Sequence, residues 1–170
     1  MKTNAMSLLR TAGSTGLAAI AVSCGSGVEP PGTELIQTDR AEYQLRTHGD
    51  GLATEIPFTF TNRAGATVYV ANCNGGAPPA LEKRVNGEWI PAWSPVYLLC
   101  ASPSMVIPPF ATYSDTLHLS APNPLSDYHP QWMVEEVPGT YRLVWHSVGF
   151  KEVALPLELR VSNPFRLATP

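Results

Sequence analysis

Apolar and polar side chains alternate over several short stretches of this chain, and this alternation constrains its fold more than any other feature. In the stretch 54–60, Thr, Ile and two Phe residues occupy every second position, with Glu, Pro and Thr between them. The same period of two recurs in 113–119, in 141–145 and in 153–161. Because successive side chains of a strand point to opposite faces, these stretches are typical of strands that bury one face.

Proline favours strands over helices in this chain. It occupies 17 of the 170 positions, about twice the usual ~5%, and it breaks helix interiors. The prolines around 127–134 leave room there for a short helical turn at most.

Turn-forming residues predict two hairpins. The pair Asn86-Gly87 inside 81–93 is a strong hairpin signal, because both residues tolerate a positive φ. The residues 62–65 are also typical of a turn, and they predict that 52–73 forms the other hairpin.

The number of short strands indicates the fold class. An opening strand near 42–46 brings the expected number to seven or eight, separated by Gly, Pro and Asn turns. This pattern predicts an all-β protein, an antiparallel immunoglobulin-like β-sandwich over 34–163, followed by a C-terminal tail at 164–170.

The N-terminal residues have the layout of an export signal. Lys2 and Arg10 precede a short apolar run at 17–22, and no acidic residue occurs before Glu29. The apolar run is too short to span the ~30 Å hydrocarbon core as a helix. A cleaved signal is therefore expected rather than a permanent membrane-spanning anchor.

The end of this signal, Ala21 to Cys24, resembles the lipobox of bacterial lipoprotein precursors, although leucine is commoner at its first position. The resemblance implies a signal peptide at 1–23 and diacylation of Cys24, followed by a flexible tether at 24–33. Because residue 25 is Gly and not Asp, it also implies the outer membrane in a host with two membranes. A plain secretory signal cleaved near Ser23 is the alternative.

Lipidation of Cys24 would leave Cys73 and Cys100 as an even pair. In an exported, oxidising setting such a pair predicts a disulfide. It would close a loop of ~27 residues, for which chain entropy gives about 3–4 kcal/mol. A zinc pair or a catalytic thiol is the alternative, but the sequence contains no C-x-x-C motif and no closely spaced His pair. No metal and no cofactor are expected.

Charge excludes one class of partner. Without the signal, the chain has 9 basic and 14 acidic residues, a net charge of −5. Phosphate binding needs a basic stripe, so no nucleic-acid partner is expected. Attachment to the membrane would depend on the N-terminal lipid, because no polybasic segment is present.

Catalytic patterns are scarce. The sequence has no G-x-S-x-G motif, and the adjacent Glu135 and Glu136 would point in different directions. Asp115, His118 and His146 are the candidate residues of a small envelope hydrolase. However, the two histidines are expected in opposite sheets, and an edge position of its strand would explain Asp115. The chain is therefore not expected to be an enzyme.

Aromatic side chains gather in two expected connections, 86–100 and 122–134. They are Trp89, Trp93, Tyr97, Tyr128 and Trp132. Trp89 is expected to be the core Trp that packs on the disulfide. The other four are candidates for a surface that binds a glycan or a protein.

Several short motifs carry a wider resemblance. They are Asn62 at the end of a Phe-Thr-Phe-Thr strand, Asn86-Gly87-Glu88-Trp89, Ile107-Pro108-Pro109 and Pro138-Gly139-Thr140-Tyr141-Arg142. Similar elements occur in immunoglobulin-like domains of bacterial lipoproteins and in small proteinase inhibitors of the BsuPI type. The resemblance covers 52–148, implies a β-sandwich and transfers no reactive-site residue. Tyr141 itself resembles a tyrosine corner, in which the hydroxyl bonds the backbone.

Together these features predict a lipid-anchored, non-catalytic protein of the bacterial cell envelope that acts as a binding or structural module. Its partners would be the membrane, through the lipid, and an envelope protein or glycan. A proteinase inhibitor of the BsuPI type is the alternative function, followed by a small envelope hydrolase.

Overall fold

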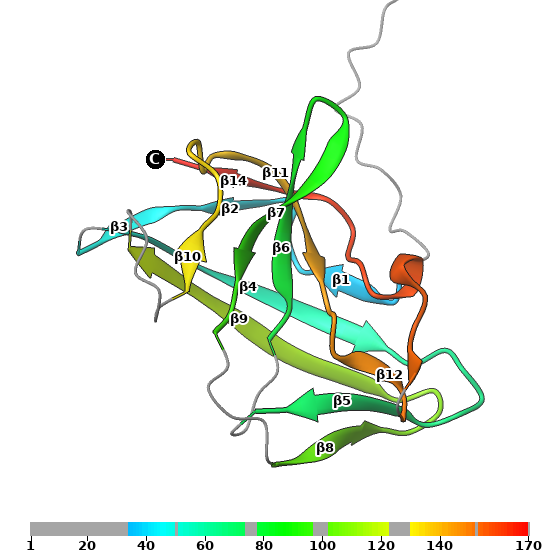
Figure 1. The fold of residues 1–170 in the computed structure, drawn as a ribbon. Helices are drawn as coiled ribbons and strands as arrows, with labels where there is room; N and C mark the ends of the chain where they lie inside the picture. Colours follow the sequence, from blue (N-terminus) through cyan, green and yellow to red (C-terminus); the bar gives the residue numbers. More distant parts are fainter. Residues whose placement is uncertain are drawn as a thin grey trace, which may run out of the picture. The chain divides into compact units, whose positions relative to one another are not determined.

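The described part of the chain consists mainly of β-strands. The computed structural model describes residues 34–49, 51–73, 78–96, 102–122, 130–151 and 153–169, which form fourteen strands in three sheets (Figure 1). The predicted signal peptide at 1–23 and the tether at 24–33 lie outside these residues. Several strands are only two or three residues long, so the described strands outnumber the expected seven or eight. The predicted class, an all-β protein of packed antiparallel sheets, is confirmed.

The first sheet, which we call the β4 sheet, is built around one long strand. β4 (Gly51–Thr61) pairs along its whole length with the antiparallel β9 (Thr112–Pro122). On its other edge it pairs with β3 (Arg46–His48) near its beginning and with β1 (Ile36–Thr38) near its end. Every second side chain of 54–60 is buried, as the alternation predicted.

The second sheet, which we call the β11 sheet, contains six strands. In spatial order they are β10 (Gln131–Trp132), β7 (Glu88–Ser94), β6 (Ala80–Val85), β11 (Gly139–Val144), β14 (Phe165–Ala168) and β2 (Glu42–Gln44). Neighbours are antiparallel except β14 and β2, which are parallel. The predicted hairpin at Asn86-Gly87 is confirmed, and φ is 52° and 90° at these two residues.

The C-terminal stretch 164–170 is not the tail that was expected. It contains β14, which lies between β11 and β2 inside the β11 sheet. Phe165 and Leu167 alternate with exposed neighbours and are buried. The strand is only four residues long, so its alternation in the sequence was too short to indicate a strand.

The third sheet, which we call the β5 sheet, contains four antiparallel strands. They are β13 (Val153–Ala154), β12 (Val148–Phe150), β5 (Val68–Asn72) and β8 (Ser102–Ile107). The strand expected over 153–161 is therefore wrong beyond its first two residues. Pro156, which has no N–H for a strand ladder, precedes the short 3-10 helix η1 (Leu157–Leu159) instead. In 127–134, where a helical turn was expected, the described residues include β10.

The stretch 52–73 does not form the predicted hairpin, because β4 and β5 belong to different sheets. The chain crosses between them at the buried Asn62. The side-chain amide of Asn62 donates hydrogen bonds to the carbonyl oxygens of Ile107 (3.0 Å) and Pro108 (2.9 Å). These bonds tie the crossing to the connection between β8 and β9. Consequently β4 pairs with β9, and β5 pairs with β8.

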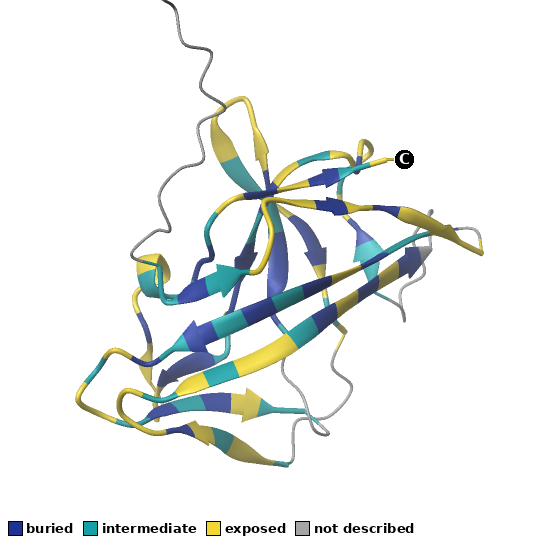
Figure 2. Ribbon diagram, turned by 180° about the vertical axis from the view of Figure 1, so that it is seen from behind, coloured by how far each residue is buried: buried dark blue, intermediate teal, exposed yellow. Residues whose placement is uncertain are grey.

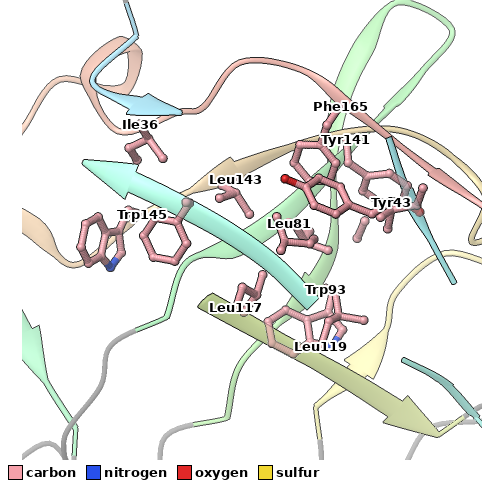
Figure 3. Packing of buried hydrophobic residues seen from close by; sticks show 14 of the residues in the cluster. Ile36, Tyr43, Leu81, Trp93, Leu117, Leu119, Tyr141, Leu143, Trp145 and Phe165 are labelled. Atoms are coloured by element: carbon pink, nitrogen blue, oxygen red, sulfur yellow. The ribbon is translucent and has the colours of Figure 1, made fainter. Parts of the chain in front are cut away.

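The three sheets pack around one hydrophobic core (Figure 3). Ile36, Leu117 and Leu119 of the β4 sheet meet Tyr43, Leu81, Trp93, Tyr141, Leu143 and Phe165 of the β11 sheet. Trp145, directly after β11, is 1% exposed, and its ring centroid lies 5.6 Å from that of Phe58 and 5.7 Å from that of Phe60. Both contacts are edge-to-face, the geometry that aromatic pairs prefer.

Tyr141 forms the expected tyrosine corner. Its side chain is fully buried, and its hydroxyl donates a hydrogen bond to the carbonyl oxygen of Val137, four residues earlier. Burial raises the pKa of this hydroxyl, so it remains protonated and able to donate. The bond fixes the approach of the chain to β11.

Candidate binding surface

The outer face of the β4–β9 pair carries an array of polar side chains, which Pro57 interrupts on β4. The array consists of Glu55, Thr59 and Thr61 on β4 and of Thr112, Ser114, Thr116, His118 and Ser120 on β9. All are exposed or half-buried, because the opposite phase of both strands faces the core (Figure 2). Cross-strand neighbours contact one another, as in the 3.4 Å hydrogen bond between the hydroxyls of Thr61 and Thr112. We call this array the polar face.

One end of the polar face is hollowed into a shallow depression of about 420 Å³. Its polar lining includes Arg46 and His48 of β3, Glu55 of β4, and His118 and Ser120 of β9. The Nδ1 atom of His118 lies 3.4 Å from Oε1 of Glu55, and both side chains are more than half exposed. Such an exposed pair contributes little to stability. Its imidazole and carboxylate therefore remain accessible to a ligand.

A second depression, of about 440 Å³, lies on the same pair of strands. Its polar lining includes Gln37, Asp39, Thr59, Ser114 and Thr116. The hydroxyl of Tyr43 donates a 2.6 Å hydrogen bond to Oδ1 of Asp39. Burial, together with this hydrogen bond, raises the pKa of Tyr43, so the phenol stays neutral and holds the carboxylate in place.

Asp115 lies on the other side of β9 and has a structural explanation. Among the described strands, β9 pairs with β4 alone, so its second edge offers unpaired backbone groups. Oδ1 of Asp115 accepts the backbone N–H of Thr116 at 2.8 Å, and Oδ2 accepts the hydroxyl of Tyr113 at 2.7 Å. Burial and the nearby carboxylate raise the pKa of Tyr113. The edge position that the sequence suggested for Asp115 is confirmed. A charge at this position disfavours pairing of the exposed edge with a strand of another molecule.

Trp93 and Trp132 do not belong to a binding surface. They are cross-strand neighbours on β7 and β10, and they are only 2% and 3% exposed. A register shift between β6 and β7 pairs Trp93 with Leu81 and turns both Ala92 and Trp93 inward. Neither indole N–H has a hydrogen-bond partner among the described residues. Tyr97 and Tyr128, the other two candidates, lie outside the described residues.

Trp89 is not the core Trp that was expected, because it is half-buried, whereas Trp93, Trp132 and Trp145 are buried. Trp89 is half-buried on β7, and the guanidinium carbon of Arg142 lies 4.6 Å from the centroid of its ring. Arg142 also forms an ion pair with Glu82, at 2.6 Å between Nη2 and Oε2. Trp89 therefore packs against the guanidinium that forms this ion pair.

The predicted disulfide and lipid site fall mostly outside the described residues. Cys24 and Cys100 are not among them, whereas Cys73 directly follows β5. Asn72 pairs with Ser102 between β5 and β8. Cys100 is two residues from Ser102 in the chain, a covalent reach of about 7 Å. This register is compatible with a Cys73–Cys100 bond, which stays a prediction.

The structure does not bring the three hydrolase candidates together. Asp115 and His118 differ by an odd number of positions on β9, so their side chains point to opposite faces. His146 lies just after β11, which belongs to a different sheet from β9. The sequence predicted that the two histidines lie in opposite sheets. Within the described ranges there is no group of three or more His, Cys, Asp or Glu residues that could hold a metal ion.

Sequence reasoning did not find the polar face, although a signal was present. Apart from Pro57, polar residues occupy the outward phase in both 55–61 and 112–120. The sequence does not indicate that these two segments pair, because the turn residues at 62–65 favour a hairpin over 52–73 instead.

No known family model matches the chain, and no curated protein is similar enough to count as a relative. In the part of the chain that the structure describes, no helix is long and apolar enough to cross a bilayer.

Proposed function

We propose that this protein is a lipid-anchored, non-catalytic module of the bacterial cell envelope, and that its polar face binds an envelope glycan. The observation that supports this proposal best is the extent of the polar face along two paired strands, with Pro57 as its apolar member on β4. Each of these strands has eleven residues, which corresponds to roughly 35 Å at ~3.4 Å per residue. A face of this length can contact several sugar units of an extended chain.

The chemistry of the polar face suits a polyhydroxylated ligand. Thr and Ser hydroxyls both donate and accept hydrogen bonds, and a carboxylate such as Glu55 accepts them. Arg46, His48 and His118 surround the 420 Å³ depression, where they can donate to the acidic or acylated substituents of a glycan.

The non-catalytic part of the proposal is supported by the separation of Asp115, His118 and His146. General acid–base catalysis needs groups within hydrogen-bond reach of one reacting centre. Asp115 already accepts two hydrogen bonds at the edge of β9. No contact among the described residues favours the BsuPI-type inhibitor over the binding module.

The anchor is tested by intact-mass spectrometry of the membrane-associated protein. We expect a chain that begins at Cys24, carries fatty acyl groups there, and has lost the two hydrogen atoms that a Cys73–Cys100 disulfide removes. An unacylated chain with both thiols titratable would contradict the anchor and the disulfide together.

The ligand is tested by sedimentation of the full chain with purified peptidoglycan and with other envelope polysaccharides. The double variant Glu55→Ala/His118→Ala removes two hydrogen-bonding side chains from the polar face. We expect about tenfold weaker binding, since each lost hydrogen bond contributes about 0.5–1.5 kcal/mol.

The matched control is Glu88→Ala/His146→Ala, which removes the same two residue types from exposed positions outside the polar face. Equal binding by the two double variants would show that the polar face is not the binding site. Capture of an envelope protein, with no binding to any glycan, would contradict the glycan as ligand.

A further inference from the structure

Three connections meet at one end of the domain. They are the β4–β5 connection at 62–67, the β8–β9 turn at 108–111 and the β12–β13 turn, whose described residues include Lys151. The amide of Asn62 joins the first to the second through the carbonyl of Pro108. β5 lies between β8 and β12 in its sheet, which places the third beside them. Figures 1 and 2 both show these turns on the same side of the molecule.

This end exposes large apolar side chains. Phe110 is 74% exposed, Val153 is 69% exposed and Phe150 is 37% exposed. We call these three residues the apolar tip. Folding leaves all three side chains accessible, and exposed apolar side chains that cluster together mark interaction sites.

The backbone conformation near the apolar tip is a second indication that these residues have a functional role. The β-turn Pro108–Ala111 is closed by a 3.2 Å hydrogen bond from the N–H of Ala111 to the carbonyl of Pro108, and Phe110 has a φ of 61° at its third position. Turns of this kind favour Gly at that position. Bulky residues with positive φ are strained, and strain of this kind concentrates at functional positions. Lys151, in the neighbouring turn, also has a positive φ of 51°.

Two basic residues flank the apolar tip. Arg63 and Lys151 are exposed on the first and third connections. Glu152, next to Lys151 in the sequence, lies outside the described residues. Apolar side chains with basic neighbours match a bilayer surface, where the former enter the acyl boundary and the latter meet headgroup phosphates.

The tether enters the domain at the same end of β4. The N–H of Thr61 donates to the carbonyl of Leu35 at 2.8 Å, and Ile36 pairs with Phe60. Thr61 directly precedes Asn62, which holds the tip turn. Cys24 and Glu34 are only ten positions apart, which corresponds to at most roughly 33–36 Å of extended chain. A lipid on Cys24 would therefore keep this end of the domain close to the membrane.

We propose that the apolar tip forms a second contact with the bilayer, in which Phe110 and Val153 enter the interfacial region and Arg63 and Lys151 lie at the headgroups. This proposal rests on the lipid anchor of the proposed function. The contact would orient β4 and β9 relative to the membrane. The depression at Arg46 and His118 lies toward the opposite end of β4 and would remain accessible.

The experiment uses the full acylated protein in phosphatidylcholine vesicles, with and without phosphatidylglycerol, whose acyl chains are partly brominated. The variant Phe110→Trp places a fluorescent reporter at the tip. We expect the emission of the introduced Trp to shift to the blue and to lose intensity with brominated lipid. The matched control is Val85→Trp, an exposed position beside the turn of the β6–β7 hairpin. We expect neither change for it.

Val153→Trp provides a second reporter if Phe110→Trp does not fold, and the thermal unfolding of both variants checks this. Stronger quenching with phosphatidylglycerol would support the headgroup contact of Arg63 and Lys151, and equal quenching would support insertion of the apolar tip alone. Equal, unquenched emission from the tip and control reporters, in protein that floats with the vesicles, would overturn the tip contact. Cross-linking of tip to tip between two copies, without quenching, would also overturn it in favour of self-association.

Failure of the anchor gives a different result. In that case the chain has no acyl mass, does not float, and behaves like its Cys24→Ser variant. If added vesicles still quench Phe110→Trp in such a protein, the tip contact stands while the anchor fails. If they do not, both proposals fail.

Discussion

Deletion of residues 164–170 is expected to abolish the cooperative unfolding of the domain. The deletion removes β14, which lies between β11 and β2, and β2 pairs with no other described strand of the sheet. Phe165 and Leu167 are buried, and each contributes about 1.5–3 kcal/mol of apolar burial. Phe165 also contacts Tyr43 and Tyr141, with centroid distances of 5.4 and 6.4 Å. The combined loss is comparable with the 5–15 kcal/mol by which whole domains are stable.

The measurement is near-ultraviolet circular dichroism during thermal unfolding. Deletion of residues 169–170 alone is the control, because Thr169 is exposed and follows β14. This shorter deletion is expected to unfold like the full chain. A cooperative transition within a few degrees of the full chain, after the longer deletion, would show that β14 is dispensable.

Trp145→Ala is expected to reduce the free energy of unfolding by about 3–5 kcal/mol, the usual cost of truncating a buried aromatic residue. Trp145 is 1% exposed and lies between the β4 and β11 sheets. Its ring contacts those of Phe58, Phe60 and Tyr113 at centroid distances of 5.6 to 5.7 Å. The truncation would leave a cavity at this junction, since three rings cannot all move inward to fill it.

Trp89→Ala is the matched control, because it makes the same change on the surface. Trp89 is half-buried and covers Arg142, and such a cation–π contact is worth about 0.5–1 kcal/mol at an exposed site. Denaturant unfolding measures both variants, and Trp145→Phe replaces Trp145→Ala if the latter does not fold. If Trp89→Ala destabilised the protein more than Trp145→Ala, the assignment of the core Trp would be reversed.

Features that depend on neighbouring residues were predicted correctly. The turn at Asn86-Gly87 needs only two residues that accept positive φ, and it forms as expected. The tyrosine corner spans four residues from Tyr141 to Val137, so its signal is also local. The burial of alternate side chains in 54–60 follows from the geometry of any strand with one face in a core.

Features that depend on distant partners were predicted wrongly. The hairpin over 52–73 fails because Asn62 bonds carbonyl groups 45 and 46 residues away. Trp93 faces the core because a register shift between β6 and β7 changes which side chains of β7 point inward. No residue type in the sequence indicates such a shift. The first error explains why the polar face was missed, and the second explains why Trp93 was wrongly expected on a binding surface.

The amino-acid order thus dictated the all-β class and the turn at Asn86-Gly87, because both follow from the conformational preferences of adjacent residues. The choice of strand partners, the burial of Trp93, Trp132 and Trp145, and the assembly of the polar face from β4 and β9 arose only in the folded chain. These outcomes depend on which of several similar strands gain most by burying their apolar faces against each other. Because all strands of the domain take part in this choice, the sequence of a single segment does not indicate its partner.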